Sequence, residues 1–565
     1  MGMRKDSVSL RTEPVEKVRG SSILEHWPLL VALAALLLTV LALLAVSLHR
    51  TQGRLIYALD DAYIHMAMAK NFAEHGVWGV TSHGFTSTSS GPLWTLLLAG
   101  VYALTGVNSE SPFIMNLLSS CLVLFIAYAI LRARGLPPST ILLALLAVIL
   151  VTPLPALIFG GMEHTLQTAL TLGAAFLAAR ILSAAEPRNE RRLYFWLLSL
   201  APLITSVRFE GMFFVFVVSV GFVLRRQWRR GLLLGLLGLL PVAAYGVVSR
   251  LHGWPWLPTS VLLKSGLIYA ASPNLVIETL KHFGFINLVE GKHLVALLIL
   301  AALLDVVGRR RGEQAWNAEQ VMTGIFVGAG ILHLAFARVG WFYRYEAYLV
   351  ALGVLVVACR FGFLFTALVE PTAPHSRPRT LSEAAGVFVL VMALFFCLVR
   401  GGTALRDIPQ AVTNGFEQDY QMAAFVRRYY QCSSVALNDI GAVNYLADIH
   451  CLDLWGLGSP AVARLRMRGS YGREEIARLA MGAGARVAII NEPYFSAIGG
   501  MPPEWIRVGQ WQIHNRLLSA DTVSIYAVDP SEARPLQAHL AEFSPELPPD
   551  VVQSGLYMQH VRPNR

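Results

Sequence analysis

The sequence predicts a polytopic α-helical membrane protein with about eleven transmembrane helices and additional interfacial helices, followed by a C-terminal extracytoplasmic α/β domain. Three observations support this fold class. Apolar residues make up 55% of the 565 positions, charged residues only 15%, and the mean hydropathy is +0.53. Long apolar runs fill the chain from residue 28 to about 400. From residue 401 onward the chain is more polar and contains short β-like runs.

The N-terminal region predicts a first membrane helix that begins on the cytoplasmic side. Residues 1–27 are polar and include several basic residues, and the apolar run 28–48 is long enough to span a bilayer. Basic residues before a first span favour the cytoplasm, and we see no small-residue cleavage site. We therefore expect a cytoplasmic tail, 1–27, and a retained helix rather than a signal peptide.

Eleven further apolar runs follow, and the number of true crossings determines on which side each connection lies. The runs cover residues 91–106, 112–131, 139–158, 164–182, 193–206, 211–224, 231–249, 293–308, 320–337, 345–366 and 384–399. The first of them begins at Gly91-Pro92 and is interrupted by Tyr102 and Thr105. We expect this run to be a shallow or re-entrant helix, which leaves eleven crossings.

The distribution of basic residues favours this count. If residues 91–106 do not cross, sixteen basic residues in the connections lie inside and five lie outside, whereas a full crossing would invert the assignment. The five outer residues are Arg208, Lys264, Lys281, Arg338 and Arg344. We therefore expect a transmembrane domain over residues 28–400, with the first outer loop, 49–111, and the region 401–565 on the outer side.

The C-terminal region predicts a small α/β domain. β-like runs occur at 434–437, 486–490, 506–513 and 523–528, and residues 473–481 have helical spacing between the first two. Cys432 and Cys451 both lie in this region and would be able to pair if it is outside the cytoplasm. The Pro-rich tail 530–565 has no clear assignment.

Two adjacent carboxylates, Asp60 and Asp61, stand in the first outer loop close to the expected membrane surface. Residues 62–74 after them have the pattern of an interfacial helix, and 84–92 form a small, polar, Gly-containing segment able to bring N–H groups and hydroxyls close to a ligand. Paired acids beside a bilayer give no stability by themselves. The alternative is a solvated loop in which one of the acids caps a helix.

Other ionisable residues of the outer face lie next to predicted helix ends. They are Glu163 with His164, Arg208 with Glu210, Lys264, and Arg344 with Tyr345. Each has an ordinary alternative: Glu163 would complement a helix N-terminus, Arg208 and Glu210 would pair, and Arg344 would snorkel. Several ionisable groups on one face of a membrane domain favour a functional site instead. Paired acids, cations and an apolar wall would suit a lipid phosphate.

Several short motifs in this order resemble the GT-C superfamily of membrane glycosyltransferases. The likeness is greatest to the protein mannosyltransferase and aminoarabinose transferase branch and to bacterial arabinofuranosyltransferases. The motifs are Asp60-Asp61-Ala62-Tyr63, Gly91-Pro92-Leu93-Trp94, Gly161-Met162-Glu163, Arg208-Phe209-Glu210-Gly211, Lys264 and Arg344-Tyr345. Residues 438–442 and 452–457 are similar to the outer-domain pattern of some bacterial members.

The resemblance implies a multi-pass protein of a bacterial-type inner membrane that uses a polyprenyl-phosphate-sugar donor outside the cytoplasm. It also implies that a carboxylate of the first outer loop is the base, and it favours Asp60 over Asp61. The acceptor would be a cell-envelope glycan, a lipid or a protein. Nucleic acid is not expected as a partner, because Lys and Arg of a membrane protein gather at helix ends.

The chemistry of such a transfer accounts for the residue types. A carboxylate, Asp60 or Asp61, would take the proton of a sugar hydroxyl, and Arg344, Lys264 and Arg208 would bind the leaving phosphate. Glu163, His164, Glu210 and Tyr345 would bind the acceptor or the sugar. One base opposite the departing phosphate implies single displacement with inversion. No cofactor is required, and no His and carboxylate spacing predicts a metal, which leaves divalent-metal dependence open.

Two other classes compete with this interpretation. A transporter of a lipid-linked or anionic solute would also place charges among many helices, although no internal repeat is evident. An inactive scaffold with the same fold is the third reading, and the retention of both acids beside three cations argues against it.

Overall fold

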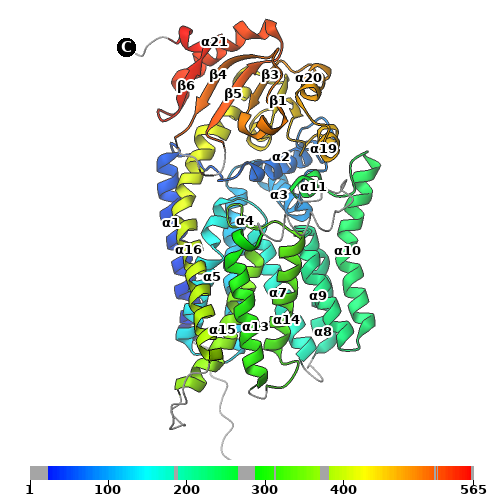
Figure 1. The fold of residues 1–565 in the computed structure, drawn as a ribbon, viewed down its shortest axis with the longest axis vertical. Coiled ribbons are helices and arrows are strands. Elements are labelled where there is room, and N and C mark those ends of the chain that lie inside the picture. Colours follow the sequence, from blue (N-terminus) through cyan, green and yellow to red (C-terminus); the bar gives the residue numbers. More distant parts are fainter. Residues whose placement is uncertain are drawn as a thin grey trace, which may run out of the picture.

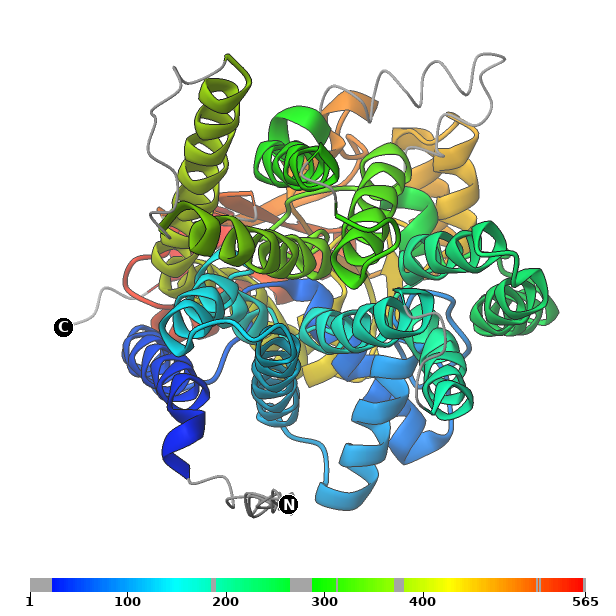
Figure 2. The same ribbon diagram turned by 90° about the horizontal axis from the view of Figure 1, so that it is seen from below.

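The computed structural model describes residues 23–183, 189–264, 287–310, 313–369, 381–514, 517 and 520–561. Figure 1 shows long helices running side by side along the long axis, with a sheet domain stacked on one end. Seen end-on in Figure 2, α1 (Trp27–Arg50) and α10 (Trp228–Leu251) lie on opposite sides of this bundle.

Each predicted apolar run forms helix. Besides α1 and α10, the helices of the membrane domain are α2 (Asp60–His75), α3 (Pro92–Thr105), α4 (Ser111–Ala133), α5 (Pro138–Val151), α6 (Leu154–Phe159), α7 (His164–Ser183), α8 (Glu190–Val207), α9 (Gly211–Leu224), α11 (Thr259–Lys264), α13 (Lys292–Arg310), α14 (Ala318–Phe336), α15 (Ala347–Val369) and α16 (Leu381–Gly415). Seven helical segments of the described chain are long and apolar enough to cross a membrane. The protein is a polytopic helical membrane protein, and the count of eleven crossings stays a prediction.

Helix α3 differs from the long helices in the way expected from its sequence. Its 14 residues extend about 21 Å, shorter than the roughly 30 Å of a bilayer core. It packs against α2 and α8, at the end of the bundle next to the sheet domain (Figure 1). A helix of this length and place is consistent with a run that does not cross.

The sheet domain contains a six-stranded mixed sheet in the order β2-β1-β3-β5-β4-β6. Its strands are β1 (Ser434–Leu437), β2 (His450–Asp453), β3 (Val487–Ile490), β4 (Ile506–Gln512), β5 (Thr522–Ala527) and β6 (Val552–Gly555). β1 is parallel to β2 and β3, and the remaining pairs are antiparallel. The helices of the domain are α17 (Gln421–Tyr429), α18 (Gly441–Leu446), α19 (Pro460–Met467), α20 (Arg473–Gly482) and α21 (Ala533–Phe543).

Alternation along the strands divides the apolar side chains between two faces of the sheet. Ala436 of β1 packs with Val462 of α19 and Ile476 of α20 on one face. On the other face Val435 and Leu437 belong to the same core as α17, α21 and the helix bundle. The sheet domain is therefore joined to the membrane domain through a continuous apolar core.

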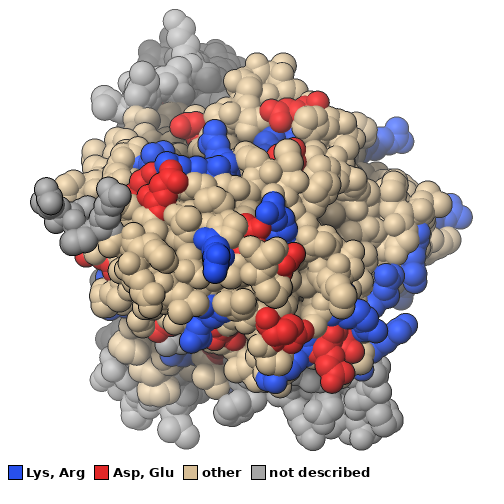
Figure 3. Space-filling model, turned by 90° about the horizontal axis from the view of Figure 1, so that it is seen from above, with Lys and Arg blue, Asp and Glu red and all other residues tan. Residues whose placement is uncertain are grey.

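The connection between the two parts is helical. Helix α16 continues through a π-helical turn, Phe416–Tyr420, into α17, so the boundary predicted at residues 400/401 lies inside a helix. Seen from above in Figure 3, Lys and Arg residues are interspersed with Asp and Glu on the face of the sheet domain that points away from the bundle. Mixed charge of this kind is typical of a surface in water.

The predicted strands at 434–437, 486–490, 506–513 and 523–528 and the helix at 473–481 are confirmed within about a residue. Strands β2 and β6, and helix α21 in the unassigned tail, were not predicted. Cys432 and Cys451 are free and form no disulfide.

Candidate functional site

The two adjacent acids, Asp60 and Asp61, are the first residues of α2, and their side chains have different partners. Both carboxylate oxygens of Asp60 accept backbone N–H groups of the sheet domain, from Gly441 and Ala442, at 2.7 Å each. A Cβ on Gly441 would lie 2.1 Å from the Asp60 carbonyl oxygen. Asp60 thus ties α2 to the start of α18, an approach that requires glycine at position 441.

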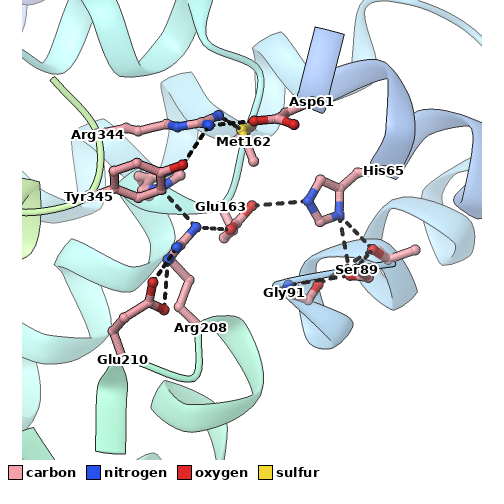
Figure 4. Close-up of polar contacts among 12 residues, drawn as sticks. Asp61, His65, Ser89, Gly91, Met162, Glu163, Arg208, Glu210, Arg344 and Tyr345 are labelled. Carbon is pink, nitrogen blue, oxygen red and sulfur yellow. Dashed lines mark hydrogen bonds and ion pairs between the residues drawn. The ribbon is translucent and has the colours of Figure 1, made fainter. Parts of the chain in front are cut away.

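Asp61 instead faces a buried arginine (Figure 4). The Nη2 of Arg344 donates to Asp61 Oδ2 and to the hydroxyl of Tyr345, the latter at 3.0 Å. The side chain of Arg344 is 2% exposed and that of Asp61 is 17% exposed. Asp61 is therefore a partly accessible carboxylate that is held by a buried cation.

An unusual turn before α15 places Arg344 at this position. Gly340, Trp341, Phe342 and Tyr343 all have positive φ, between +45° and +79°. Left-handed conformations of three consecutive aromatic residues cost free energy, so the surroundings must impose them. The buried carboxylate of Glu346 accepts the Gly340 N–H at 2.8 Å and pairs with Arg400, and Arg400 donates to the Tyr343 carbonyl at 2.8 Å.

A second buried arginine, Arg208, lies where α8 ends. Its guanidinium donates to Glu163 at 2.6 Å and to Glu210 at 2.5 and 3.2 Å, and it lies 3.0 Å from His164 Nε2. Figure 4 shows Arg208 and Arg344 approaching Tyr345, with guanidinium carbons 5.3 and 4.8 Å from its ring centroid. Two of the three predicted cations, Arg208 and Arg344, therefore belong to one cluster with Tyr345.

Two glycines of the predicted motifs permit the close packing around Glu163. Gly161 has φ +66°, and a Cβ there would lie 2.5 Å from the ring of Tyr57. A Cβ on Gly91 would lie 2.6 Å from the Val207 carbonyl and 3.0 Å from Glu163 Cδ. Any larger residue at Gly91 would push against the acid that pairs with Arg208.

His65 is a member of the cluster that was not predicted. Its Nε2 lies 3.6 Å from Glu163 Oε2, and its Nδ1 lies 2.8 Å from the hydroxyl of Thr95. Residues 86–89 of the segment 84–92 are buried, and Ser89 also contacts His65, at 3.4 Å. The spacing of four residues from Asp61 along α2 is the sequence signal that places His65 on the same helix face.

The cluster lines a cavity of about 160 Å³. Its walls include Arg208, Glu210, Arg344 and Tyr345, together with Ser90, Met162, Phe209, Met212, Phe213, Ser260, Val261, Phe336, Ala337 and Arg338. A larger apolar groove of about 690 Å³ adjoins it at Phe209, between α3, α8 and α10. The site therefore combines guanidinium groups with apolar walls.

The remaining predicted cation, Lys264, has a side chain outside the described residues. The helix that carries it, α11, borders the cavity through Ser260 and Val261. Thr259 at the start of α11 donates its hydroxyl to the carbonyls of Ser87 and Leu457. These bonds bring α11, the segment 84–92 and the sheet domain together.

Two acids of the sheet domain have raised pKa values: Asp439, which is close to Asp60, and the buried Asp453. Burial, and then the charges of Asp60 and Asp61, raise the pKa of Asp439 to about 8. Burial raises the pKa of Asp453 to about 6, although three backbone N–H groups donate to its carboxylate. Among the described residues, no group of three or more His, Cys, Asp or Glu side chains is arranged to hold a metal ion.

Comparisons with known proteins give one sequence match and several structural likenesses. The family described as "Domain of unknown function (DUF8728)" matches residues 409–526. No curated protein matches the chain.

The structural likenesses cover most of the chain. A crystal structure of ArnT from Cupriavidus metallidurans bound to undecaprenyl phosphate is 14% identical, with 88% of this chain and 99% of that chain covered and a TM-score of 0.46. The apo oligosaccharyltransferase of Archaeoglobus fulgidus is 12% identical, covering 90% of this chain and 75% of that one, with a TM-score of 0.47. The likeness to both chains is one of overall fold.

Proposed function

We propose that the protein is a membrane glycosyltransferase that moves a sugar from a polyprenyl-phosphate-sugar donor to an acceptor outside the cytoplasm. The acceptor would be a glycan, a lipid or a protein of the cell envelope, and the membrane a bacterial-type inner membrane. The observation that supports this proposal is the cavity in which Arg208 and Arg344 meet, with Asp61 beside them, at the sheet-domain end of an apolar bundle. Guanidinium groups are suited to a phosphate and the apolar walls to a lipid chain.

In the proposed reaction the acceptor hydroxyl oxygen attacks the anomeric carbon of the donor sugar. Its proton passes to the carboxylate of Asp61, while the bond between the anomeric carbon and the phosphate oxygen breaks. The electron pair of that bond goes to the phosphate, which Arg344 and Arg208 stabilise through charge-assisted hydrogen bonds. Attack opposite the leaving group inverts the anomeric carbon.

The geometry favours Asp61 over Asp60 as the base, which reverses the preference taken from the motif resemblance. Asp60 accepts two N–H groups from the sheet domain with both oxygens, so taking a proton would cost it at least one of these bonds. Asp61 is 17% exposed and pairs with a proposed phosphate ligand, Arg344. We assign Asp60 to positioning: it orients α2 and, through it, Asp61.

The other predicted residues receive roles from their contacts. Glu163, Glu210 and His164 surround Arg208, and we propose that they orient it, with Glu210 also facing the sugar from the cavity wall. Tyr345 separates the two arginines and would contact the sugar phosphate. Lys264 remains a proposed third ligand of the phosphate.

The test is sugar transfer from a polyprenyl-phosphate-sugar by the purified protein, comparing Asp61→Asn with Asp60→Asn. Loss of a general base lowers turnover by about 10²- to 10⁴-fold, so Asp61→Asn should reduce kcat by that factor at unchanged Tm. Asp60→Asn should lower Tm and affect transfer less, because the amide still accepts one N–H group. Normal turnover by Asp61→Asn would contradict the assignment, and no transfer by the wild-type protein with any such donor would contradict the function.

A further inference from the structure

The three arginines of the cavity differ in whether a carboxylate neutralises them. Arg208 pairs with Glu163 and Glu210, and Arg344 pairs with Asp61. Arg338 also lines the cavity and is exposed, but it has no ion pair and its guanidinium makes no hydrogen bond among the described residues. The two buried arginines are therefore neutralised by carboxylates. Arg338 is not, and because it is exposed it lies where the cavity opens, which we call its mouth.

The backbone at Arg338 is held firmly although its side chain is exposed. Its carbonyl lies 3.1 Å from His333 Nε2, and the carbonyl of the preceding Ala337 accepts from the side chain of Asn287 at 2.8 Å. The guanidinium carbon of Arg338 lies 5.4 Å from the ring centroid of Trp341. A fixed backbone with an exposed charged end suits a residue that meets a ligand before the ligand reaches the buried groups.

The surroundings of Arg338 suit a ligand that arrives from the lipid. Trp341 is 39% exposed and Phe336 is 60% exposed, and aromatic residues of this kind gather at membrane interfaces. Arg338 lies two residues after the last residue of α14. Together with Phe336 and Ala337 it lines the mouth of the cavity. A phosphate carried on a lipid chain at this level would pass these side chains.

We propose that Arg338 is the capture residue for the donor: it binds the phosphate of the incoming polyprenyl-phosphate-sugar at the cavity mouth and passes it inward to Arg344. The proposal rests on the proposed function and adds a binding residue to it. An exposed, unpaired cation attracts an anion over several ångströms and is screened by salt. The buried arginines must exchange a carboxylate for the phosphate, so they act after capture.

The first experiment measures binding of undecaprenyl phosphate to the purified protein in nanodiscs of phosphatidylcholine. Arg338→Ala should weaken binding about tenfold, as expected for the loss of a charge-assisted hydrogen bond. The salt dependence of binding should also become shallower than in wild type. Arg338→Lys keeps the charge and should retain most of the affinity. Arg250→Ala is the matched control: this arginine is exposed in the last turn of α10 and lines neither cavity, so its removal should change nothing.

The second experiment separates the donor from ordinary anionic lipids, whose headgroups share the phosphate. If Arg338 binds donor, the loss in Arg338→Ala is the same with or without phosphatidylglycerol in the nanodisc. A loss that appears only when phosphatidylglycerol is present would contradict donor capture and indicate a lipid headgroup site. In sugar transfer by Arg338→Ala the KM for the donor should rise by a larger factor than kcat falls, because capture precedes the chemical step.

Two failures are distinguishable. Wild-type protein that does not bind undecaprenyl phosphate at all would end both the proposed function and this inference. Wild-type binding that Arg338→Ala leaves unchanged would end only the capture role of Arg338.

Discussion

The buried arginines of the site show why single residues here have effects beyond their own contacts. Each guanidinium is neutralised by at least one carboxylate, and removing one partner of a buried pair leaves an uncompensated charge that costs about 3–5 kcal/mol. Glu163 is fully buried and joins Arg208 to His65. If a variant of Glu163 or Arg208 loses activity, its stability must be measured as well, because the loss can come from unfolding. Arg338 is exposed and has no buried partner, so its replacement does not raise this question.

Asp439 provides a prediction about pH. Its pKa is raised to about 8 in the folded protein and is about 3.9 in an unfolded chain. Between these values the folded state binds more protons than the unfolded state, so the contribution to stability is present below about pH 4 and is lost as pH rises to about 8. Asp439→Asn should therefore flatten the decline of Tm from about pH 5 to about pH 9 and raise Tm at the alkaline end.

The control for this measurement is Glu504→Gln, which removes one exposed acid from the same domain. Its curve should follow that of wild type. If Asp439→Asn also follows the wild-type curve, the acid does not take up a proton on folding. Asp453, with a pKa raised to about 6, adds to the decline only at the acidic end of the range.

At the scale of elements, the helices could be predicted because burial in lipid demands long apolar runs and leaves few alternatives. Strands β1, β3 and β5 could be predicted because they are mostly buried and apolar, and β4 because it carries apolar residues at Ile506, Val508 and Trp511. β2, His-Cys-Leu-Asp, and β6, Val-Gln-Ser-Gly, are short edge strands without an apolar pattern. Their assignment depends on the neighbouring strand rather than on their own residues.

Helix α2 illustrates a limit of the same kind. Its apolar pattern predicted a helix along the interface, whereas nine of its residues are buried because it lies beneath the sheet domain and against α3. The groups that contact it there, such as the Asn444 and Tyr445 carbonyls that accept from Lys70, are more than 370 positions away in the chain. Pattern along a sequence carries no information about such a partner.

The contact between α2 and α18 gives a prediction at this scale. Gly441→Ala would place a Cβ 2.1 Å from the Asp60 carbonyl oxygen, so α2 must move away from the sheet domain and Asp61 must move with it. We expect a lower Tm and a loss of sugar transfer larger than that of Asp60→Asn. Gly482→Ala is the control, because a Cβ there meets nothing within 4 Å and alanine favours the helix. Wild-type Tm and transfer in Gly441→Ala would show that the close approach does not hold α2.

For the whole molecule, the site could be predicted in part. The argument that ionisable residues on one membrane face converge selected Asp61, Arg208, Glu163, Glu210, His164, Arg344 and Tyr345, and the structure brings these together. The same argument did not show that Asp60 tethers α2 to the sheet domain, and it did not include His65. It also gave no reason to single out Arg338 among the outer basic residues. Those distinctions depend on which carboxylates and N–H groups pair in space.

The position of the site also bears on the transporter alternative. Substrate sites of secondary transporters lie near the middle of the membrane, between repeats. Here the charged cluster lies where α2, at the junction with the sheet domain, meets the ends of α7, α8 and the turn before α15. A site closed by the sheet domain at one end of the bundle suits transfer at a membrane surface better than passage through it.

The orientation of the whole molecule is the last prediction, and it rests on the excess of basic residues in the connections that the sequence predicts to lie inside. The sheet domain shares its end with Arg208 and Arg344, so it should face the outside. Arg468, exposed just after α19, is suited to a cysteine label, provided that the exposed native Cys432 is first replaced by serine. An impermeant thiol reagent should label Arg468→Cys in intact cells, and it should label Arg226→Cys, at the opposite end between α9 and α10, only after the membrane is opened. The reverse pattern would place the sheet domain and Asp61 in the cytoplasm, where the positive-inside rule would fail and transfer from an outer-leaflet donor would be impossible.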